Sequence, residues 1–389
     1  MKTAASTMRT GPDPRLAVLR DTLAKLGMQR LLDGSWFRKA ALEHMRRHSQ
    51  NVTSAHWDKV YPKLDVEKRA DVVIARACRR ASVAGVLASA GASTGEIISI
   101  FTEGLAAPIG VPAVALSMCS EAAYTTLLQI DLACDLGSIY GVPFNVDDIG
   151  DVTTLFGLAL GMQEKKAPAQ ARADADAKPV GLTERLLVLE DGEGARMIGR
   201  KLLEDALVRN VVPVVGMAIS ARWNYVGTRR LAHAVRRYVR YRRALAAALR
   251  KLKLEALPEP EIHMEGAWLL ATCEGDASND TTLALGLIMD HLPEKTRQAI
   301  TADRAFGDDE EGWFDALALV PPSMHSALMD VLYLVAAADR AFQPAERRFL
   351  HRIGRALKLE VDLERVEQIC RHLSLGEELP AELIRSKGG

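Results

Sequence analysis

Aromatic residues are scarce in this chain of 389 residues: tryptophan, tyrosine and phenylalanine together make up 5% of it. A packed interior must therefore be built mainly from alanine, leucine, valine and isoleucine, and such small side chains allow helices to approach closely. Apolar residues still make up 48% and charged residues 26%, as in an ordinary globular protein. This composition excludes wholesale disorder and, at this length, predicts two or three domains.

Cysteines are few, odd in number and widely spaced, without a Cys-x-x-Cys pair: Cys78, Cys119, Cys134, Cys273 and Cys370. The pattern argues against a disulfide framework or a zinc site and predicts thiols buried as small apolar groups in a reducing compartment. The first twenty residues contain no apolar run, so no secretory signal is expected. We therefore expect a cytoplasmic protein, which could lie peripherally on the inner membrane.

Common catalytic motifs are missing too: the sequence has no G-x-x-x-x-G-K-[ST], G-x-S-x-G, H-E-x-x-H or G-x-G-x-x-G. His44 and His48 lie one helical turn apart, but no acidic residue follows at a spacing that suggests a partner, so we interpret them as surface groups. We expect no catalytic residues and a binding protein rather than an enzyme. Catalytic groups can assemble from distant positions, so an unrecognised metal-dependent hydrolase stays open as an alternative.

Strand-like alternation is almost absent, while apolar residues recur at helical spacing, which predicts an all-α fold. Residues 51–65 are expected to form a loop with Trp57 and Tyr61 as anchors, and Asp65 to cap the next helix. Residues 163–181 contain almost no large apolar group and predict a flexible insertion. We expect four parts: an N-terminal helical segment (1–69), an Ala/Gly-rich helical bundle (70–254), a smaller helical domain (262–373) and a tail (374–389).

Two stretches of the bundle, residues 81–95 and 104–120, are rich in alanine, glycine and serine and almost free of charge. Both are shorter than the roughly 20 apolar residues of a spanning helix. Three alternatives are open for them: a buried helical hairpin, an insertion into the membrane interface, or a partner-binding surface. The next helix, over residues 121–140, is apolar on most sides except at Asp131 and Asp135.

Several short motifs of the first half follow one another in a fixed order: Gly91-Ala-Ser-Thr-Gly95, Gly110-Val-Pro112, Ile139-Tyr140-Gly141, Val212-Pro213-Val-Val-Gly216 and Asn224-Tyr225. In order and spacing, residues 70–245 resemble the EcsC family. The resemblance implies a helical bacterial protein that acts near the membrane, without a settled biochemical activity. For Pro213, Gly216 and Asn224 we expect a structural role, in which Asn224 satisfies backbone groups exposed by a proline kink.

A basic helix is predicted from about Arg222 to Leu254, with an apolar stripe and no acidic residue. Its dense cationic side suits an anionic membrane surface, with Trp223, Tyr225, Tyr238 and Tyr241 at the headgroup level. The expected contacts are Arg229, Arg230, Arg236, Arg237, Arg240 and Arg243. The alternatives are a solvated surface, a protein partner, or docking onto the other half of the chain; nucleic acid is less favoured, because no nucleic-acid-binding motif is present.

Docking between the halves is an alternative because charge is unevenly distributed along the chain. From Glu255 onward there are 25 acidic and 13 basic residues, whereas the preceding residues hold 25 acidic and 37 basic ones. Opposite net charges attract, so the two halves either bind each other or bind different partners.

Two segments of the second half resemble each other: Trp268 to Leu292 and Val331 to Leu357 each read as an apolar helix, an acidic turn and a second helix. Residues 262–373 resemble the TerB family of tellurite-resistance-associated proteins, in which an Asp-Gly pair ends one helix and a glutamate begins the next. Asp339 and Glu346 match these positions, but Arg340 stands where the glycine is expected.

The acidic turns are candidate cation ligands: Asp276, Asp280, Asp339 and Glu346. Carboxylate oxygens suit a divalent cation, although their spacing does not match an EF-hand loop. The alternative is that Asp339 and Glu346 cap helices. No other cofactor is indicated. The sequence as a whole predicts a non-enzymatic, membrane-proximal interaction or adaptor protein of a bacterial stress or envelope system, with a soluble protein-binding adaptor as the alternative.

Overall fold

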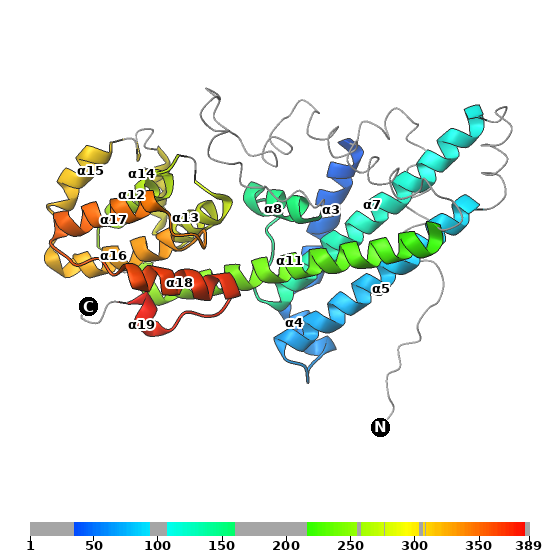
Figure 1. Ribbon diagram of the computed structural model, residues 1–389, viewed down its shortest axis with the longest axis horizontal. Helices are drawn as coiled ribbons and strands as arrows, with labels where there is room; N and C mark the ends of the chain where they lie inside the picture. Colours follow the sequence, from blue (N-terminus) through cyan, green and yellow to red (C-terminus); the bar gives the residue numbers. More distant parts are fainter. Residues whose placement is uncertain are drawn as a thin grey trace. The chain divides into compact units, whose positions relative to one another are not determined.

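The computed structural model describes residues 35–93, 107–159, 216–254, 258–275, 277–302, 306–307 and 309–385. Within these ranges the chain forms 14 helices and no strand, so the predicted all-α class is confirmed (Figure 1). The helices are α3 (Ser35–Asn51), α4 (Ser54–Val60), α5 (Val66–Ser93), α7 (Ala107–Ile139), α8 (Ile149–Ala159), α11 (Gly216–Leu252), α12 (Pro260–Thr272), α13 (Asn279–His291), α14 (Glu294–Ala302), α15 (Glu310–Leu317), α16 (Pro322–Ala336), α17 (Pro344–Leu357), α18 (Leu363–Leu375) and α19 (Ala381–Ile384). The predicted insertion 163–181 lies outside the described residues.

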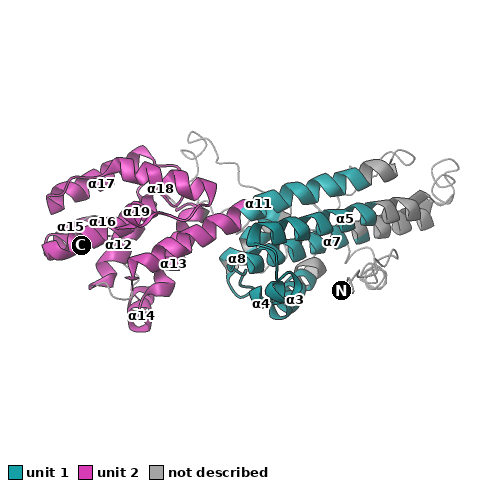
Figure 2. Ribbon diagram, turned by 90° about the horizontal axis from the view of Figure 1, so that it is seen from below, with its two compact units in different colours: residues 1–236 teal, residues 237–389 magenta. Residues whose placement is uncertain are grey.

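The chain divides into two compact units, residues 1–236 and 237–389 (Figure 2). The division falls inside α11, so this one helix contributes residues to both units. Pro258 and Pro260, which predict a domain boundary from the sequence, lie where α11 has ended and α12 begins. These two prolines therefore follow the end of α11, whereas the division into compact units falls inside α11.

Helices α5 and α7 form an antiparallel hairpin in the N-terminal unit (Figure 1). Small side chains let them approach closely, and their buried contact includes Ala81, Ala84, Tyr124 and Leu128. The end of α7 lies beside the start of α5, where the Tyr140 hydroxyl donates a hydrogen bond to Glu67 Oε2 at 2.9 Å. Most side chains of the two uncharged stretches lie outside the described residues, so the three alternatives for them stay predictions.

A short helix, α4, lies where the sequence predicts a loop over residues 51–65, so that prediction was wrong. Trp57 on α4 is buried, and Tyr61 stacks on it with ring centroids 6.1 Å apart. The burial of Trp57, together with the stacking of Tyr61 one helical turn further on, stabilises a helical turn for which the local sequence has no periodic pattern. The predicted cap is confirmed: Asp65 Oδ1 accepts a hydrogen bond from the backbone N–H of Lys68 at 2.8 Å.

The cysteines behave as the sequence predicts where their side chains are described. Cys78, Cys134 and Cys370 are buried and Cys273 is half-buried, all as free thiols. Burial raises the pKa of both Cys273 and Cys370 to about 12, so these two side chains are neutral at physiological pH. They therefore act as small apolar groups of the core.

The C-terminal unit surrounds a single apolar core with α16 at its centre. Residues from Leu328 to Ala338 are all buried, and the apolar side of the second half of α11 packs into the same core. One charged pair is buried with them: Arg365 Nη1 lies 2.8 Å from Asp330 Oδ1, and each side chain is only 7% exposed. The Arg365 guanidinium also lies over the ring of Tyr333. Each charge is tolerated in the core because the other one compensates it.

The two helix–turn–helix segments predicted in the second half are present as α12–α13 and α16–α17. Helix α17 begins as expected, with Pro344 in its first turn. The backbone N–H of Gln343 donates a hydrogen bond to Glu346 Oε2 at 2.8 Å, completing a capping box. Each preceding turn contains a residue with positive φ, Gly275 in the first segment and Arg340 in the second.

Replacement of Gly376 by alanine is expected to destabilise the C-terminal unit. Gly376 ends α18 with a φ of +65°, and a Cβ there would meet Arg240 Cβ at 2.6 Å and the Tyr241 backbone nitrogen at 3.2 Å. Left-handed strain of about 1–2 kcal/mol and overlap of about 1–3 kcal/mol together predict a loss of about 2–5 kcal/mol. Gly141, with a φ of +73° and no atom within 4 Å of the added Cβ, is the control. Denaturant unfolding should show a clearly smaller loss for Gly141→Ala; equal losses would contradict the close approach.

His263 is expected to make the C-terminal unit acid-sensitive. Its Nδ1–H donates to the Glu259 carbonyl oxygen at 3.0 Å, while Nε2 has no hydrogen-bond partner among the described residues. Burial lowers the pKa of His263 below its ordinary 6.5. The unfolded chain therefore takes up this proton at a higher pH than the folded one. The contribution of neutral His263 to the free energy of unfolding is complete above about pH 6.5. It falls at lower pH by at most about 1.4 kcal/mol per pH unit, until the pH reaches the pKa of His263 in the folded protein.

The measurement compares wild type with His263→Phe, which keeps an aromatic ring but cannot titrate. The difference between their free energies of unfolding should change below about pH 6.5, where an ordinary histidine takes up its proton. Because Trp57 of the other unit is also buried, unfolding of this unit is followed by hydrogen exchange of peptides from α12 and α16 rather than by total tryptophan fluorescence. Parallel pH profiles of the two proteins would show that His263 titrates normally.

Candidate functional site

The first half of α11 has two different sides. Its buried side consists of residues spaced three or four apart: Asn224, Thr228, Leu231, Ala232 and Val235. The opposite side exposes Arg222, Arg229 and Arg230, together with Trp223, which is 56% exposed, and Tyr225, which is 37% exposed. We call these five exposed residues the arginine face. They face outward because burial of the opposite side fixes the rotation of the helix.

The arginine face is not neutralised within the part of the chain that the structure describes. Helix α11 contains no acidic residue, and no described acidic side chain pairs with Arg222, Arg229 or Arg230. Helix α5 likewise has no acidic residue after Asp71. Arg229 lies near α5: burial raises the pKa of Cys78, and the charge of Arg229 partly offsets this effect. These adjacent helices therefore carry a local excess of positive charge, which attracts anions.

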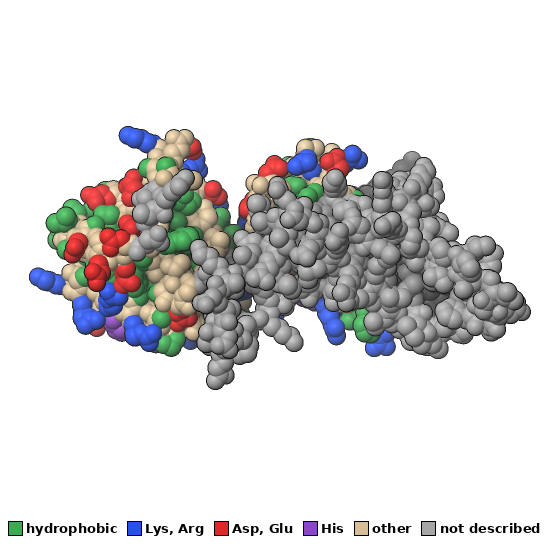
Figure 3. All heavy atoms as spheres, turned by 90° about the horizontal axis from the view of Figure 1, so that it is seen from above, with side chains coloured by type: hydrophobic (Ala, Val, Ile, Leu, Met, Phe, Trp, Pro, Cys, Tyr) green, Lys and Arg blue, Asp and Glu red, His purple; other side chains and the backbone are tan. Residues whose placement is uncertain are grey.

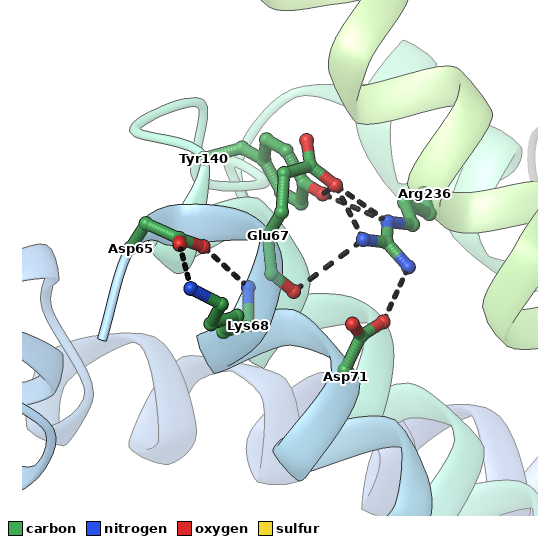
Figure 4. Close-up of polar contacts among 6 residues, drawn as sticks. All are labelled: Asp65, Glu67, Lys68, Asp71, Tyr140 and Arg236. Atoms are coloured by element: carbon green, nitrogen blue, oxygen red, sulfur yellow. Dashed lines mark hydrogen bonds and ion pairs between the residues drawn. The ribbon is translucent and has the colours of Figure 1, made fainter.

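Arg236, predicted as an anion contact, instead ties α11 to the start of α5 and the end of α7 (Figure 4). Its Nη1 lies 2.7 Å from Asp71 Oδ1, its Nη2 pairs with Glu67, and its Nε donates to the Tyr140 hydroxyl at 2.9 Å. Burial acts to lower the pKa of Arg236, but its hydrogen bonds to Glu67, Asp71 and Tyr140 outweigh burial and raise it. Burial also raises the pKa of Tyr140 to about 12, so its hydroxyl stays protonated.

The other predicted anion contacts lie in the second half of α11, within the C-terminal unit. Arg237 is exposed. Arg240 is half-buried and packs against Gly376, and Arg243 Nη2 lies 3.5 Å from Glu378 Oε1. Of the six predicted arginines, the structure thus places Arg229 and Arg230 together on the exposed side of the N-terminal unit.

Sequence reasoning overlooked Arg222, although it precedes the exposed Trp223 directly. The buried positions on α11 would have indicated it, because they place Arg222 on the side opposite to Asn224 and Thr228.

Arginines of the C-terminal unit differ from those of the arginine face, because several have acidic partners. Arg347 Nη2 lies 2.6 Å from Glu367 Oε1, and Arg352 pairs with Glu310. On the face drawn in Figure 3, this unit (left) shows acidic and basic side chains close together. Such exposed pairs contribute little to stability, but they cancel the local field.

The predicted structural motif is only partly described. Pro213 lies outside the described residues, and Gly216 is the first residue of α11. Asn224 is 2% exposed, so its amide belongs to the interior of the N-terminal unit. This burial agrees with a structural role and places Asn224 away from the arginine face.

The candidate cation ligands are engaged in contacts within the protein, apart from Asp276, which lies outside the described residues. Asp280 pairs with Arg340, Asp339 Oδ1 accepts a hydrogen bond from the Ala341 backbone N–H at 2.8 Å, and Glu346 caps α17. Among the residues that are described, no three histidine, cysteine, aspartate or glutamate side chains are arranged to hold a metal ion. Capping, the alternative, is confirmed for Glu346, and a cation at these turns stays a prediction.

The positively charged side chain of Arg340 lies beside the acidic residues of these turns. Its guanidinium pairs with Asp280 and lies over the Tyr241 ring, 4.7 Å from the centroid. Tyr241, expected at the headgroup level, is instead buried, and its hydroxyl donates to the Ala338 carbonyl oxygen at 2.7 Å. The residue that departs from the TerB pattern therefore supplies a positive charge beside one of the candidate ligands.

The structure contradicts our interpretation of His44 and His48 as surface groups without acidic partners. Both are partly buried against α7, where Asp131 and Asp135 lie at the same one-turn spacing. His44 Nε2 is 2.6 Å from Asp131 Oδ1, and His48 Nε2 is 2.8 Å from Asp135 Oδ1. The sequence signal was the pair of aspartates on an otherwise apolar helix, because buried carboxylates need a partner.

None of the helices in the described ranges combines the length and the hydrophobicity that crossing a membrane requires. Comparisons with known protein families, with curated proteins and with solved structures find no match. The resemblances to the EcsC and TerB families therefore stay predictions, and the functional argument depends on the chemistry of the chain itself.

Arg236→Gln is expected to destabilise the N-terminal unit by about 1–2 kcal/mol, because it removes charge-assisted hydrogen bonds whose acidic partners are half exposed and screened by solvent. The control is Arg237→Gln, which changes an exposed neighbour of the same type and should cost less than about 0.5 kcal/mol. Urea unfolding of both variants measures the difference. Equal stability of the two would contradict the role of Arg236 as an internal tie.

Proposed function

We propose that this protein is a non-enzymatic, peripheral membrane-binding adaptor whose N-terminal unit binds anionic phospholipid bilayers through the arginine face. The observation that carries the proposal is the set of three arginines, Arg222, Arg229 and Arg230, that pair with no described acidic side chain and lie beside the exposed rings of Trp223 and Tyr225. Arginines attract anionic headgroups, and tryptophan and tyrosine favour the interface between headgroups and acyl chains.

The energies are sufficient for reversible binding. Each arginine near an anionic leaflet contributes about 1 kcal/mol, so three contribute about 3 kcal/mol, or roughly a hundredfold in partitioning. Screening shortens the range of this attraction to about 3 Å at ~1 M salt, so binding should be salt-sensitive. The resemblance to the EcsC and TerB families agrees with a place in a bacterial envelope or stress system, with the C-terminal unit as the adaptor part.

Vesicle flotation tests the proposal. The full chain should float with vesicles of phosphatidylglycerol and phosphatidylcholine at low salt, but neither with phosphatidylcholine alone nor at ~1 M salt. Replacing Arg222, Arg229 and Arg230 by glutamine should weaken binding by roughly a hundredfold. The matched control replaces Arg347, Arg348 and Arg352 of α17 by glutamine, which removes the same charge from the C-terminal unit.

Equal loss in both triple variants would mean that net charge, rather than the arginine face, determines binding. Absence of binding to anionic vesicles at low salt would remove the membrane proposal. In that case the soluble adaptor, whose partner capture is independent of lipid, becomes the better explanation.

A further inference from the structure

The cluster of His44, His48, Asp131 and Asp135 brings two histidines against two carboxylates in a partly buried place between α3 and α7. Besides the two contacts already described, His48 Nδ1 lies 3.2 Å from Asp131 Oδ1, so three nitrogen–oxygen contacts join α3 to α7. The two Nε2 contacts are hydrogen bonds, in which each ring donates its N–H to a carboxylate oxygen. The Nδ1 contact is an ion-pair distance, and the second carboxylate that it brings close to His48 favours an additional proton on the cluster.

His48 is the ring on which the additional proton belongs. It alone has a carboxylate oxygen near both of its nitrogens, Asp131 at Nδ1 and Asp135 at Nε2. The two aspartate side chains are only 12% and 11% exposed, and they lie one turn apart on the same helix. An imidazolium between them offsets both their burial and their mutual repulsion.

Helix α7 and the elements that contact it carry other titratable and charged groups: Glu43, Arg46 and Arg47 on α3, His56, Asp58 and Lys59 on α4, Cys134 on α7, and Asp147, Asp148 and Asp151 around the start of α8. Arg46 pairs with Asp147, and Arg47 pairs with Glu43, both at exposed positions. Burial raises the pKa of Cys134 well above its ordinary value, so this thiol is neutral. Asp151 is buried and accepts a hydrogen bond from the Asn145 backbone N–H at 2.7 Å.

We propose that this cluster is a proton-dependent clamp, in which a proton held on His48 fastens α3 to α7. In the unfolded or detached segment an ordinary histidine releases its proton near pH 6.5, whereas the attached cluster keeps it to higher pH. Attachment is therefore complete below about pH 6.5 and is lost as pH rises through the value at which the folded cluster releases the proton. This dependence has the opposite sign to that of His263 and is independent of the proposed membrane binding.

Hydrogen exchange of the full-length protein measures the clamp directly. After correction for the intrinsic pH dependence of exchange, the protection of α3 peptides should fall above about pH 6.5, by up to tenfold per pH unit, because detachment releases one proton. Peptides from α17, which has no comparable cluster, should keep constant protection. Protection of α3 that does not change with pH over this range would overturn the proposal.

Two histidine variants separate the clamp from histidines in general. His48→Gln keeps a polar side chain but cannot hold the proton, so the protection of α3 should no longer depend on pH. The control, His233→Gln, changes an exposed histidine of α11 and should retain the wild-type profile. A wild-type profile in His48→Gln would overturn the clamp.

Nitrogen-15 spectra of the histidine rings measure the protonation state of His48 in the wild-type protein. This test therefore applies even if His48→Gln fails to fold. At about pH 7.5, where an ordinary histidine is neutral, His48 should show protons on both ring nitrogens. A neutral ring for His48 at this pH would overturn the assignment.

Discussion

Burial of the apolar side of α11 is the constraint on which the proposed binding surface of this protein depends. Leu231 and Val235 must face the interior of the N-terminal unit, and this requirement fixes the rotation of the helix about its axis. The rotation in turn determines which arginines remain in contact with water. The arginine face is therefore a consequence of packing, and a shift of the apolar positions by one residue would turn it toward the core.

The position of acidic residues on α5 determines what each arginine of α11 does. Glu67 and Asp71 lie in the first turns of α5 and bind Arg236, whereas the rest of α5 is free of acidic residues. Arg229 therefore keeps its charge available, although its local sequence closely resembles that around Arg236, each being part of an Arg-Arg pair. One helix thus carries a structural arginine and, two turns away, an arginine that we propose to bind lipid.

Local sequence predicted those features that depend on neighbouring residues. The all-α class, the cap at Asp65, the capping box at Glu346 and the burial of Cys78 follow from periodicity and residue type, and the structure confirms them. The family resemblances and the predicted domain limits stay predictions. An all-α fold is compatible with many helical families and with many divisions into domains.

Tertiary contacts determined the features that local sequence did not predict. His44 and Asp131 are 87 residues apart, and no local pattern joins them. Helix α4 depends on the burial of Trp57, and the division of the chain inside α11 depends on which core each half of that helix enters. Charged residues on an apolar helix, such as Asp131 and Asp135, are the one sequence feature that indicates such distant partners.

The absence of acidic residues from α11 has a consequence for its conformation outside the protein. Favourable pairs between oppositely charged side chains one turn apart cannot form in this helix, and its closely spaced guanidinium groups repel one another. The helix therefore depends on surrounding protein for its conformation. A synthetic peptide covering residues 216–252 should be largely unwound in dilute buffer and gain helicity on micelles of anionic detergent, which makes such a peptide a poor substitute for the intact chain.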